Sequence, residues 1–259
     1  MRIIRYFVLL MLLIYQLVFS LACNNAQTIV QIDESMIRAS VVILNDLSLS
    51  TKGDKVSRLG TSDIKRLPQT LLVGGGEIAY GTIDSDSDAA FHRLKIQKPP
   101  SAPATPSNKN PLMRMTERKA YEELRASFEV AFEEWEKRTY KDLEEWLAEI
   151  EPELKREPYS KETDFIGAVN RSVQILQEPE KESAKKFLLI VSDCRNDTRR
   201  KSELRPIPED VKLLTVTDAE NSDALKEFSP SNFSSARSAV DYIINQINSQ
   251  LHRRSGDER

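Results

Sequence analysis

Two aspartates follow two short apolar runs of the chain, and hydroxyl side chains stand close to them in the sequence. Asp46 follows the run 39–44 and opens the sequence Asp-Leu-Ser-Leu-Ser, whereas Asp193 follows the run 187–191. Short runs rich in β-branched residues are typical of strands that are buried on both faces of a sheet. Ligands of such sheets bind beyond the carboxyl ends of the strands, which is where both aspartates are expected.

Carboxylate and hydroxyl oxygens are the donors that a small hard cation such as Mg²⁺ prefers. Ser48 and Ser50 lie within the sequence that Asp46 opens, and Thr163 stands just before an amphipathic helix pattern. Each piece alone has an ordinary interpretation, because Asp, Ser and Thr are also common helix caps and turn residues. The hypothesis of a metal site depends on all of them occurring together.

Asp46, Ser48, Ser50, Thr163 and Asp193 resemble the metal-ion-dependent adhesion site of von Willebrand factor type A domains. That family has Asp-x-Ser-x-Ser after its first strand, a threonine before a later helix and an aspartate after its fourth strand. The resemblance covers about residues 38–250, without an inserted linker and long helix. It implies Mg²⁺ or Mn²⁺, with the three hydroxyls as direct ligands, the two aspartates binding directly or through water, and a partner's carboxylate completing the shell. The chain departs from the family at Leu49 and Cys194, where glycine is frequent and positive φ would be costly for other residues.

The remaining pattern predicts an α/β fold with a doubly wound, mostly parallel sheet, similar to von Willebrand factor A and Rossmann-type folds, because buried strands alternate with helices. A hairpin is expected at one edge of the sheet, and the domain is expected over 39–252 with a polar tail at 253–259. The expected strands are 77–83, 90–96, 187–191 and 211–216, and the expected helices are 61–73, 164–176, 222–228 and 234–251.

A Pro- and Ser-rich linker at 98–111 and a long helix at 112–158 are inserted into this pattern. The stretch of it from Thr116 to Glu157 would be about 60 Å long, whereas a strand of ordinary length covers only about 20 Å. We therefore expect the helix to project, and its stripe of Phe128, Phe132, Trp135 and Trp146 to bind a second copy or a partner protein. The alternative is that the stripe covers the domain's own surface.

The first residues have the layout of a secretory signal, with Arg2 and Arg5 before an apolar run that ends in Ala22-Cys23. This end resembles the lipobox of bacterial lipoproteins, which implies a signal peptide at 1–22, an acylated Cys23 and a spacer at 23–38. The alternative is an uncleaved membrane anchor. Both interpretations predict an extracytoplasmic protein on the cell membrane or the outer membrane, in the periplasm or at the cell surface.

These features favour a tethered binding, adhesion or assembly module that engages a protein partner, rather than an enzyme. The alternative is a Mg²⁺-dependent enzyme of the phosphoryl-transfer type, but the sequence offers no phosphate-binding loop and no histidine partner for Ser48. The net charge of −3 gives no field that would attract nucleic acid. Arg195, Arg199 and Arg200 are either a solvated loop or a basic rim beside the metal that favours acidic partners.

Overall fold

The computed structural model describes residues 38–53, 56–85, 91–106, 111–197, 203–217 and 225–256. All of them belong to one of two units of the chain, Glu34–Arg259. The predicted signal peptide, Cys23 and the spacer up to residue 37 lie outside the described residues. Within the described part of the chain, the structure has no helix with the length and apolar character that membrane crossing requires.

A six-stranded sheet in the order β3-β2-β1-β4-β5-β6 forms the centre of this unit. Every strand is parallel to its neighbours except β3, which is antiparallel to β2. The strands are β1 (Ala39–Asp46), β2 (Gly76–Ile83), β3 (His92–Ile96), β4 (Lys185–Val191), β5 (Val211–Val216) and β6 (Ser231–Phe233). This confirms an α/β fold with a mostly parallel sheet and an antiparallel hairpin at one edge.

The central strand β1 is buried along its whole length, as its apolar sequence predicts. Val41 and Ile43 face one core cluster, and Val42 and Leu44 face the other. Successive side chains of a strand point to opposite faces, so one short run contributes to both cores. The strand continues past the expected end at residue 44, because Asn45 and Asp46 still pair with Thr82 and Ile83 of β2.

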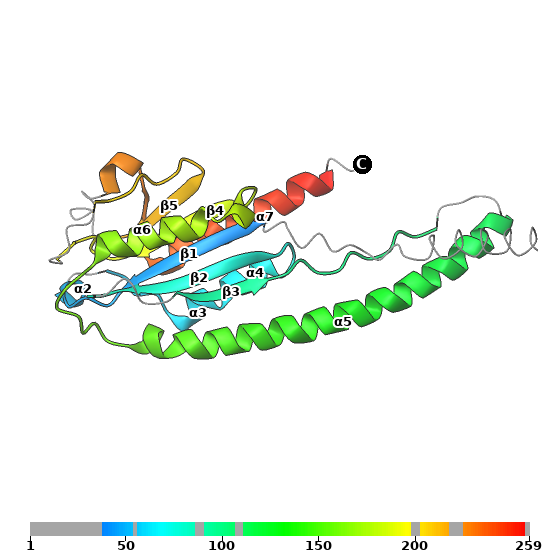
Figure 1. The fold of residues 1–259 in the computed structure, drawn as a ribbon, viewed down its shortest axis with the longest axis horizontal. Helices are drawn as coiled ribbons and strands as arrows, with labels where there is room; N and C mark the ends of the chain where they lie inside the picture. The colour runs from blue at the N-terminus through cyan, green and yellow to red at the C-terminus, as the bar shows by residue number, and fades with distance from the viewer. Residues whose placement is uncertain are drawn as a thin grey trace, which may run out of the picture. The chain divides into compact units, whose positions relative to one another are not determined.

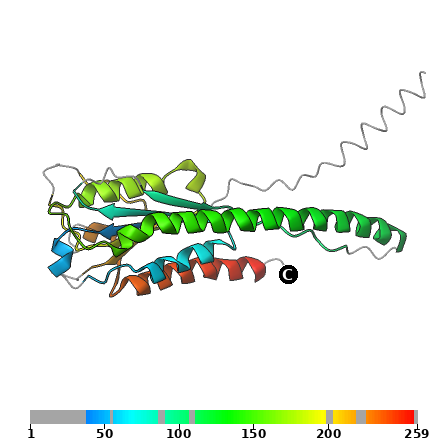
Figure 2. The same ribbon diagram turned by 90° about the horizontal axis from the view of Figure 1, so that it is seen from below.

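Helices cover both faces of the sheet, with α6 on one face and α4 and α7 on the other (Figure 2). The helices are α2 (Ser50–Gly53), α3 (Thr61–Ile64), α4 (Arg66–Leu71), α5 (Pro111–Lys155), α6 (Phe165–Leu176) and α7 (Ala236–Gly256), with a short 3₁₀ helix at Pro179–Lys181 and another at 225–228. Helix α7 continues beyond residue 252, where the polar tail was expected to begin.

The prediction of one helix over 61–73 is wrong, because the chain is interrupted at Lys65 and restarts as α4. The restart places Pro68 in the first turn of α4. The first N–H groups of a helix have no partner within it, so the missing N–H of proline costs nothing there.

Helix α5 is a single helix of 45 residues that packs beside β3 (Figure 1). The indole Nε1 of Trp135 donates to the carbonyl of Gln97 at 2.9 Å, and that of Trp146 donates to the carbonyl of His92 at 3.1 Å. Moving forward along α5 therefore means moving backward along β3, so α5 is antiparallel to β3. The distances agree, because the stretch from Trp135 to Trp146 rises about 16 Å and that from His92 to Gln97 about 17 Å.

The apolar stripe of α5 is buried only in its C-terminal half. Trp135 and Trp146 are 8% and 3% exposed, whereas Leu124 and Phe132 are 46% and 36% exposed. The N-terminal half of α5 runs past the end of the sheet, as Figures 1 and 2 show. The expectation that Trp135 and Trp146 bind a partner is therefore wrong. Their rings fill the space over β3, and removal of the whole helix would open the core.

The two halves of the stripe should respond differently to truncation. We expect Trp146→Ala to lower the free energy of unfolding by about 3 kcal/mol or more, because it leaves a cavity and an unpaired carbonyl on His92. Phe132→Ala on the same stripe should lower it by only about 1 kcal/mol, because the ring is 36% exposed and loses mainly its contacts with Phe128 and Trp135. Chemical denaturation monitored by circular dichroism measures both, and equal effects would contradict the division of the helix into a packed and a projecting half.

Candidate metal centre

Asp46 is the last residue of β1, and both of its carboxylate oxygens accept hydrogen bonds from neighbouring loops. The backbone N–H of Ser48 donates to Oδ1 at 2.8 Å, and the hydroxyl of Ser192 donates to Oδ2 at 2.5 Å. Asp46 is 6% exposed. Burial raises the pKa of this carboxyl above its ordinary value, the negative charge of Asp193 adds to the rise, and the hydrogen bonds from Ser192 and Ser48 oppose it.

The hydroxyls of Ser48 and Ser50 lie side by side after Asp46. Their oxygens are 2.8 Å apart, and Ser48 is 1% exposed. Ser50 begins α2, and the Thr51 hydroxyl donates to the carbonyl of Ser48 at 2.7 Å, which fixes the turn. The Asp-Leu-Ser-Leu-Ser sequence thus forms a tight loop whose oxygen atoms lie close together.

The loop that carries Thr163 is bonded to this first loop. Leu49 N–H donates to the carbonyl of Ser160 at 2.7 Å, and Ser160 N–H donates to the carbonyl of Leu47 at 3.1 Å. Thr163 is 2% exposed and lies directly before the cap of α6. The cap itself is Asp164, whose Oδ1 accepts from the N–H of Gly167 at 3.1 Å.

Asp193 follows β4 and is fully buried. Its Oδ1 accepts from the backbone N–H of Arg195 at 3.1 Å, whereas its Oδ2 has no hydrogen-bond partner in the described part of the chain. The Nε of Arg195 lies 3.8 Å from Oδ2, which is too long for a hydrogen bond. A buried carboxylate oxygen without a donor costs free energy, so this atom is suited to a cation or a water.

The loop of Asp193 is joined to both of the others. Asp197 N–H donates to the carbonyl of Thr163 at 3.0 Å, and Ser192 reaches Asp46 as described above. The structure therefore brings Asp46, Ser48, Ser50, Thr163 and Asp193 to three connected loops at the carboxyl edge of the sheet. Two carboxylates and three hydroxyls on connected loops are oxygen donors of the types that a hard divalent cation prefers.

Two residues of this region were not predicted from the sequence. Ser192 connects Asp46 to the next loop, because its oxygen also accepts from the N–H of Cys194 at 2.8 Å. Asn196 accepts from the N–H of Ile166 at 3.1 Å and so ties the Asp193 loop to the first turn of α6. Their sequence signal is their position in the run after β4, where small polar residues cap neighbouring elements.

Arg195 is exposed on this loop, with 49% of its side chain accessible. Arg199 and Arg200, the other members of the expected basic rim, lie outside the described residues. The rim is therefore represented here by Arg195 alone, which lies beside the Asp193 carboxylate.

A cluster of carboxylates at Glu77, Glu178 and Glu180 is a second place where a metal could be sought. Protein cations already occupy it: Arg93 donates to Glu77 at 2.6 Å and to both oxygens of Glu178, and Lys181 lies 3.1 Å from each of these two glutamates. Burial alone would raise the pKa of Glu178, but Arg93 and Lys181 together hold it below its ordinary value. The cluster is a compensated ion network.

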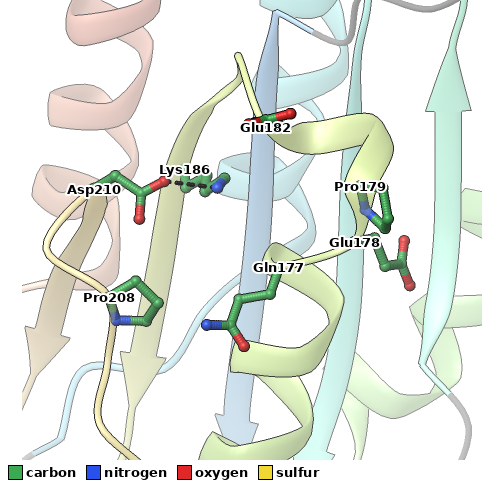
Figure 3. Close-up of a pocket in the computed structure, with 7 residues that line it drawn as sticks. All are labelled: Gln177, Glu178, Pro179, Glu182, Lys186, Pro208 and Asp210. Carbon is green, nitrogen blue, oxygen red and sulfur yellow. Dashed lines mark hydrogen bonds and ion pairs between the residues drawn. The ribbon is translucent and has the colours of Figure 1, made fainter.

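The pocket in Figure 3 lies at the opposite edge of the sheet from the three loops. Its lining comes from the segment after α6, the start of β4 and the turn before β5, and comprises Gln177, Glu178, Pro179, Glu182, Lys186, Pro208 and Asp210. The Nζ of Lys186 donates to Asp210 at 2.6 Å, so its charge is paired. None of the predicted site residues lines this pocket.

Cys194 has a φ of +60°, a conformation in which glycine is favoured and other residues are strained. The side chain is nevertheless 4% exposed, and burial raises the pKa of the thiol to about 12. Leu49 does not have positive φ, so of the two departures from glycine only Cys194 carries the strain. The buried thiol remains protonated and unreactive at neutral pH.

Substitutions at Cys194 should reverse the usual order of alanine and glycine. Both changes remove the buried sulfur, but only glycine relieves the left-handed backbone, so Cys194→Gly should be about 1 kcal/mol more stable than Cys194→Ala. At an ordinary position glycine is the less stable of the two. Urea denaturation of the two variants makes the comparison, and an alanine variant of equal or higher stability would show that the loop is relaxed.

Comparisons of the chain with protein-family models, with curated proteins and with solved structures gave no match.

Proposed function

We propose that the chain is a membrane-tethered, extracytoplasmic binding module of the von Willebrand factor A type, which engages a protein partner through a Mg²⁺- or Mn²⁺-dependent face. The observation that carries the proposal is the buried Oδ2 of Asp193, which has no hydrogen-bond partner in the described part of the chain and lies on a loop connected to those of Asp46 and Thr163. The order of Asp46, Ser48, Ser50, Thr163 and Asp193 along the strands supports the same conclusion.

In this proposal Ser48, Ser50 and Thr163 hold the cation directly, and Asp46 and Asp193 compensate its charge directly or through water. The cation keeps part of its shell for an acidic side chain of the partner, since Mg²⁺ seldom receives all its ligands from one protein. Arg195 at the rim adds attraction for an acidic partner.

A binding role is favoured over phosphoryl transfer by the groups that surround the loops. Lys186 is the buried lysine nearest in sequence to the Asp193 loop. It lies at the opposite edge of the sheet, where it forms an ion pair with Asp210. The thiol of Cys194 is protonated at neutral pH, which makes it a poor nucleophile. Among the described residues of these loops no histidine accompanies the oxygen donors, and the two lysines, Lys52 and Lys161, are exposed.

The substitution Asp46→Asn tests the metal. In EDTA, the variant should be as stable as the unchanged protein or more stable, because it removes a buried charge. The amide oxygen can still accept from the Ser48 N–H, and the amide NH2 can donate to the Ser192 oxygen in a bond of reversed direction. Since burial raises the pKa of Asp46, the charge costs stability above that pKa and the advantage of asparagine should fade as the pH is lowered through it. With Mg²⁺ the order should reverse, because only the unchanged protein gains stability from the bound ion.

Calorimetric titration with Mg²⁺ or Mn²⁺ gives the direct readout. We expect binding to the full chain and its loss in Asp46→Asn and Ser48→Ala. Asp142→Asn and Ser127→Ala, exposed on α5, are matched controls that should bind like the unchanged protein. Equal binding in all variants, or none in the unchanged protein, would overturn the metal centre.

The tether is tested separately at Cys23. We expect the mature protein to lack residues 1–22 and to carry an acyl group on Cys23, and Cys23→Ala to keep its first residues. Mass spectrometry and partitioning between membrane and aqueous fractions measure this. An unchanged mass in Cys23→Ala with unchanged membrane association would leave the uncleaved anchor as the explanation.

A further inference from the structure

The projecting half of α5 has an end whose charge differs from that of the rest of it. We call Pro111–Lys119 the tip and residues 120–134 the shaft. The tip carries three basic residues and one acidic residue, Arg114, Arg118, Lys119 and Glu117. The shaft carries five glutamates and one arginine. Residues 97–106, which run beside this half of the helix, add one lysine and no acidic residue (Figures 1 and 2). The projecting half is therefore basic at its end and acidic along its length.

The apolar residues of the tip are spread around the helix axis. Leu112, Met113 and Met115 belong to its first turns, and at about 100° per residue positions 113 and 115 lie about 160° apart. Met115 is 73% exposed, more than any other large apolar side chain in the described part of the chain. A helix that lies flat on a membrane has its apolar residues on one face. The tip is suited instead to contact by its end.

The tip points away from the edge of the sheet at which β1 begins. Trp135 is bonded to Gln97, and the register of β3, β2 and β1 places Gln97 about level with Arg38. From Trp135 to Pro111 the helix rises about 36 Å. The segment from Cys23 to Arg38 cannot span more than about 50 Å, even when fully extended. A membrane that holds Cys23 is thus within about 50 Å of Arg38, and an upright α5 meets it whenever the segment spans less than about 36 Å.

We propose that the tip contacts the membrane that holds the tether, so that α5 stands between the bilayer and the sheet. This inference rests on the tether of the proposed function and does not use the metal. The apolar residues of the tip enter the headgroup region, and its basic residues meet anionic headgroups. The same surface repels the acidic shaft. In the upright arrangement most of the shaft lies beyond a Debye length, about 10 Å, from that surface.

The ion pair at the border of tip and shaft leaves the tip basic. Arg118 Nε lies 3.0 Å from a carboxylate oxygen of Glu122, and both side chains are more than half exposed. Exposed pairs of this kind contribute little, and the guanidinium has further donors for a phosphate. If Glu122 is counted with the tip, three basic residues still face two acidic ones.

The contact gives the proposed binding module a fixed standoff from the membrane. Strand β1 adds about 25 Å to the 36 Å of the projecting helix. The carboxyl edge with Asp46 is then held about 60 Å from the bilayer. A rigid helix that rests on the surface resists the approach of this edge to the membrane, which a chain segment alone does not do.

A fluorescent amino acid at position 115 or at position 130 tests the contact with the full, tethered chain. The chain is added to vesicles of phosphatidylethanolamine and phosphatidylglycerol that carry nitroxide-labelled lipids. Val130 is the matched control position, because it is 60% exposed and lies about 22 Å further along the same helix. We expect the nitroxide lipids to quench position 115 and to leave position 130 unquenched, whereas aqueous iodide should quench position 130 more.

Charge reversal tests the chemistry of the contact. Arg118→Glu with Lys119→Glu should lower the ratio of lipid-quenched to unquenched fluorophore at position 115 at least about tenfold, because each basic residue near an anionic surface contributes severalfold to binding. Vesicles of phosphatidylcholine alone should weaken the contact in the same direction. The matched control is Arg125→Glu with Lys137→Glu, two exposed basic residues beyond the tip. It should behave like the unchanged chain, as should Asp46→Asn.

Flotation with the vesicles separates the failure of the tip from that of the tether. A chain that does not float refutes the tether and the contact together. A chain that floats with position 115 unquenched by the lipids keeps the tether and overturns the contact. If position 115 is then also shielded from iodide, a protein covers the tip. Equal lipid quenching at positions 115 and 130 overturns the upright arrangement, and an unchanged ratio in Arg118→Glu with Lys119→Glu overturns the role of the basic residues.

Discussion

The buried carboxylate of Asp46 constrains the whole carboxyl edge of the sheet. It ends a strand that is buried on both faces, so water compensates little of its charge. The protein compensates it with the N–H of Ser48 and the hydroxyl of Ser192, and these bonds fix the loops that follow β1 and β4. Asp193 is more buried still and has one oxygen without a donor. Two buried carboxylates in connected loops therefore leave a surplus of negative charge, which a divalent cation would neutralise.

The second constraint is the mismatch between strand and helix lengths. Strand β3 carries the chain back toward the amino edge, and α5 must return it to the loop of Thr163. Strand β3 together with Gln97 is about 17 Å long. This length covers only the part of α5 from Trp135 to Trp146 and the turns that follow it. Beyond Trp135 toward the N-terminus the stripe keeps its apolar residues but is no longer covered by the sheet, as the 46% exposure of Leu124 shows.

The parts of the fold with a strong periodic signal could be predicted from the sequence. The strands β1, β4 and β5 are apolar runs with turn residues at their ends, and α6 has one apolar face. Their hydrophobic pattern alone therefore identifies them. Pro68 predicts a defect in the helix expected over 61–73, but the position of the break at Lys65 could not be predicted, because it depends on how the two pieces pack on α7. The length of β3 determines which half of the α5 stripe is covered. The hydrophobic periodicity of α5 gives no information on that length. At the site, the aspartates and hydroxyls have a recognisable spacing, whereas Ser192 acts through a contact across 146 residues that local sequence does not reveal.

The topology keeps the two surfaces apart. Because α5 is antiparallel to β3, and β3 is antiparallel to β2, α5 runs in the same direction as β1. Its projecting half therefore leaves the sheet at the amino edge, where Arg38 leads into β1, whereas Asp46 and Thr163 lie at the carboxyl edge. A partner bound to the projecting half of α5 would therefore leave the carboxyl edge of the sheet free.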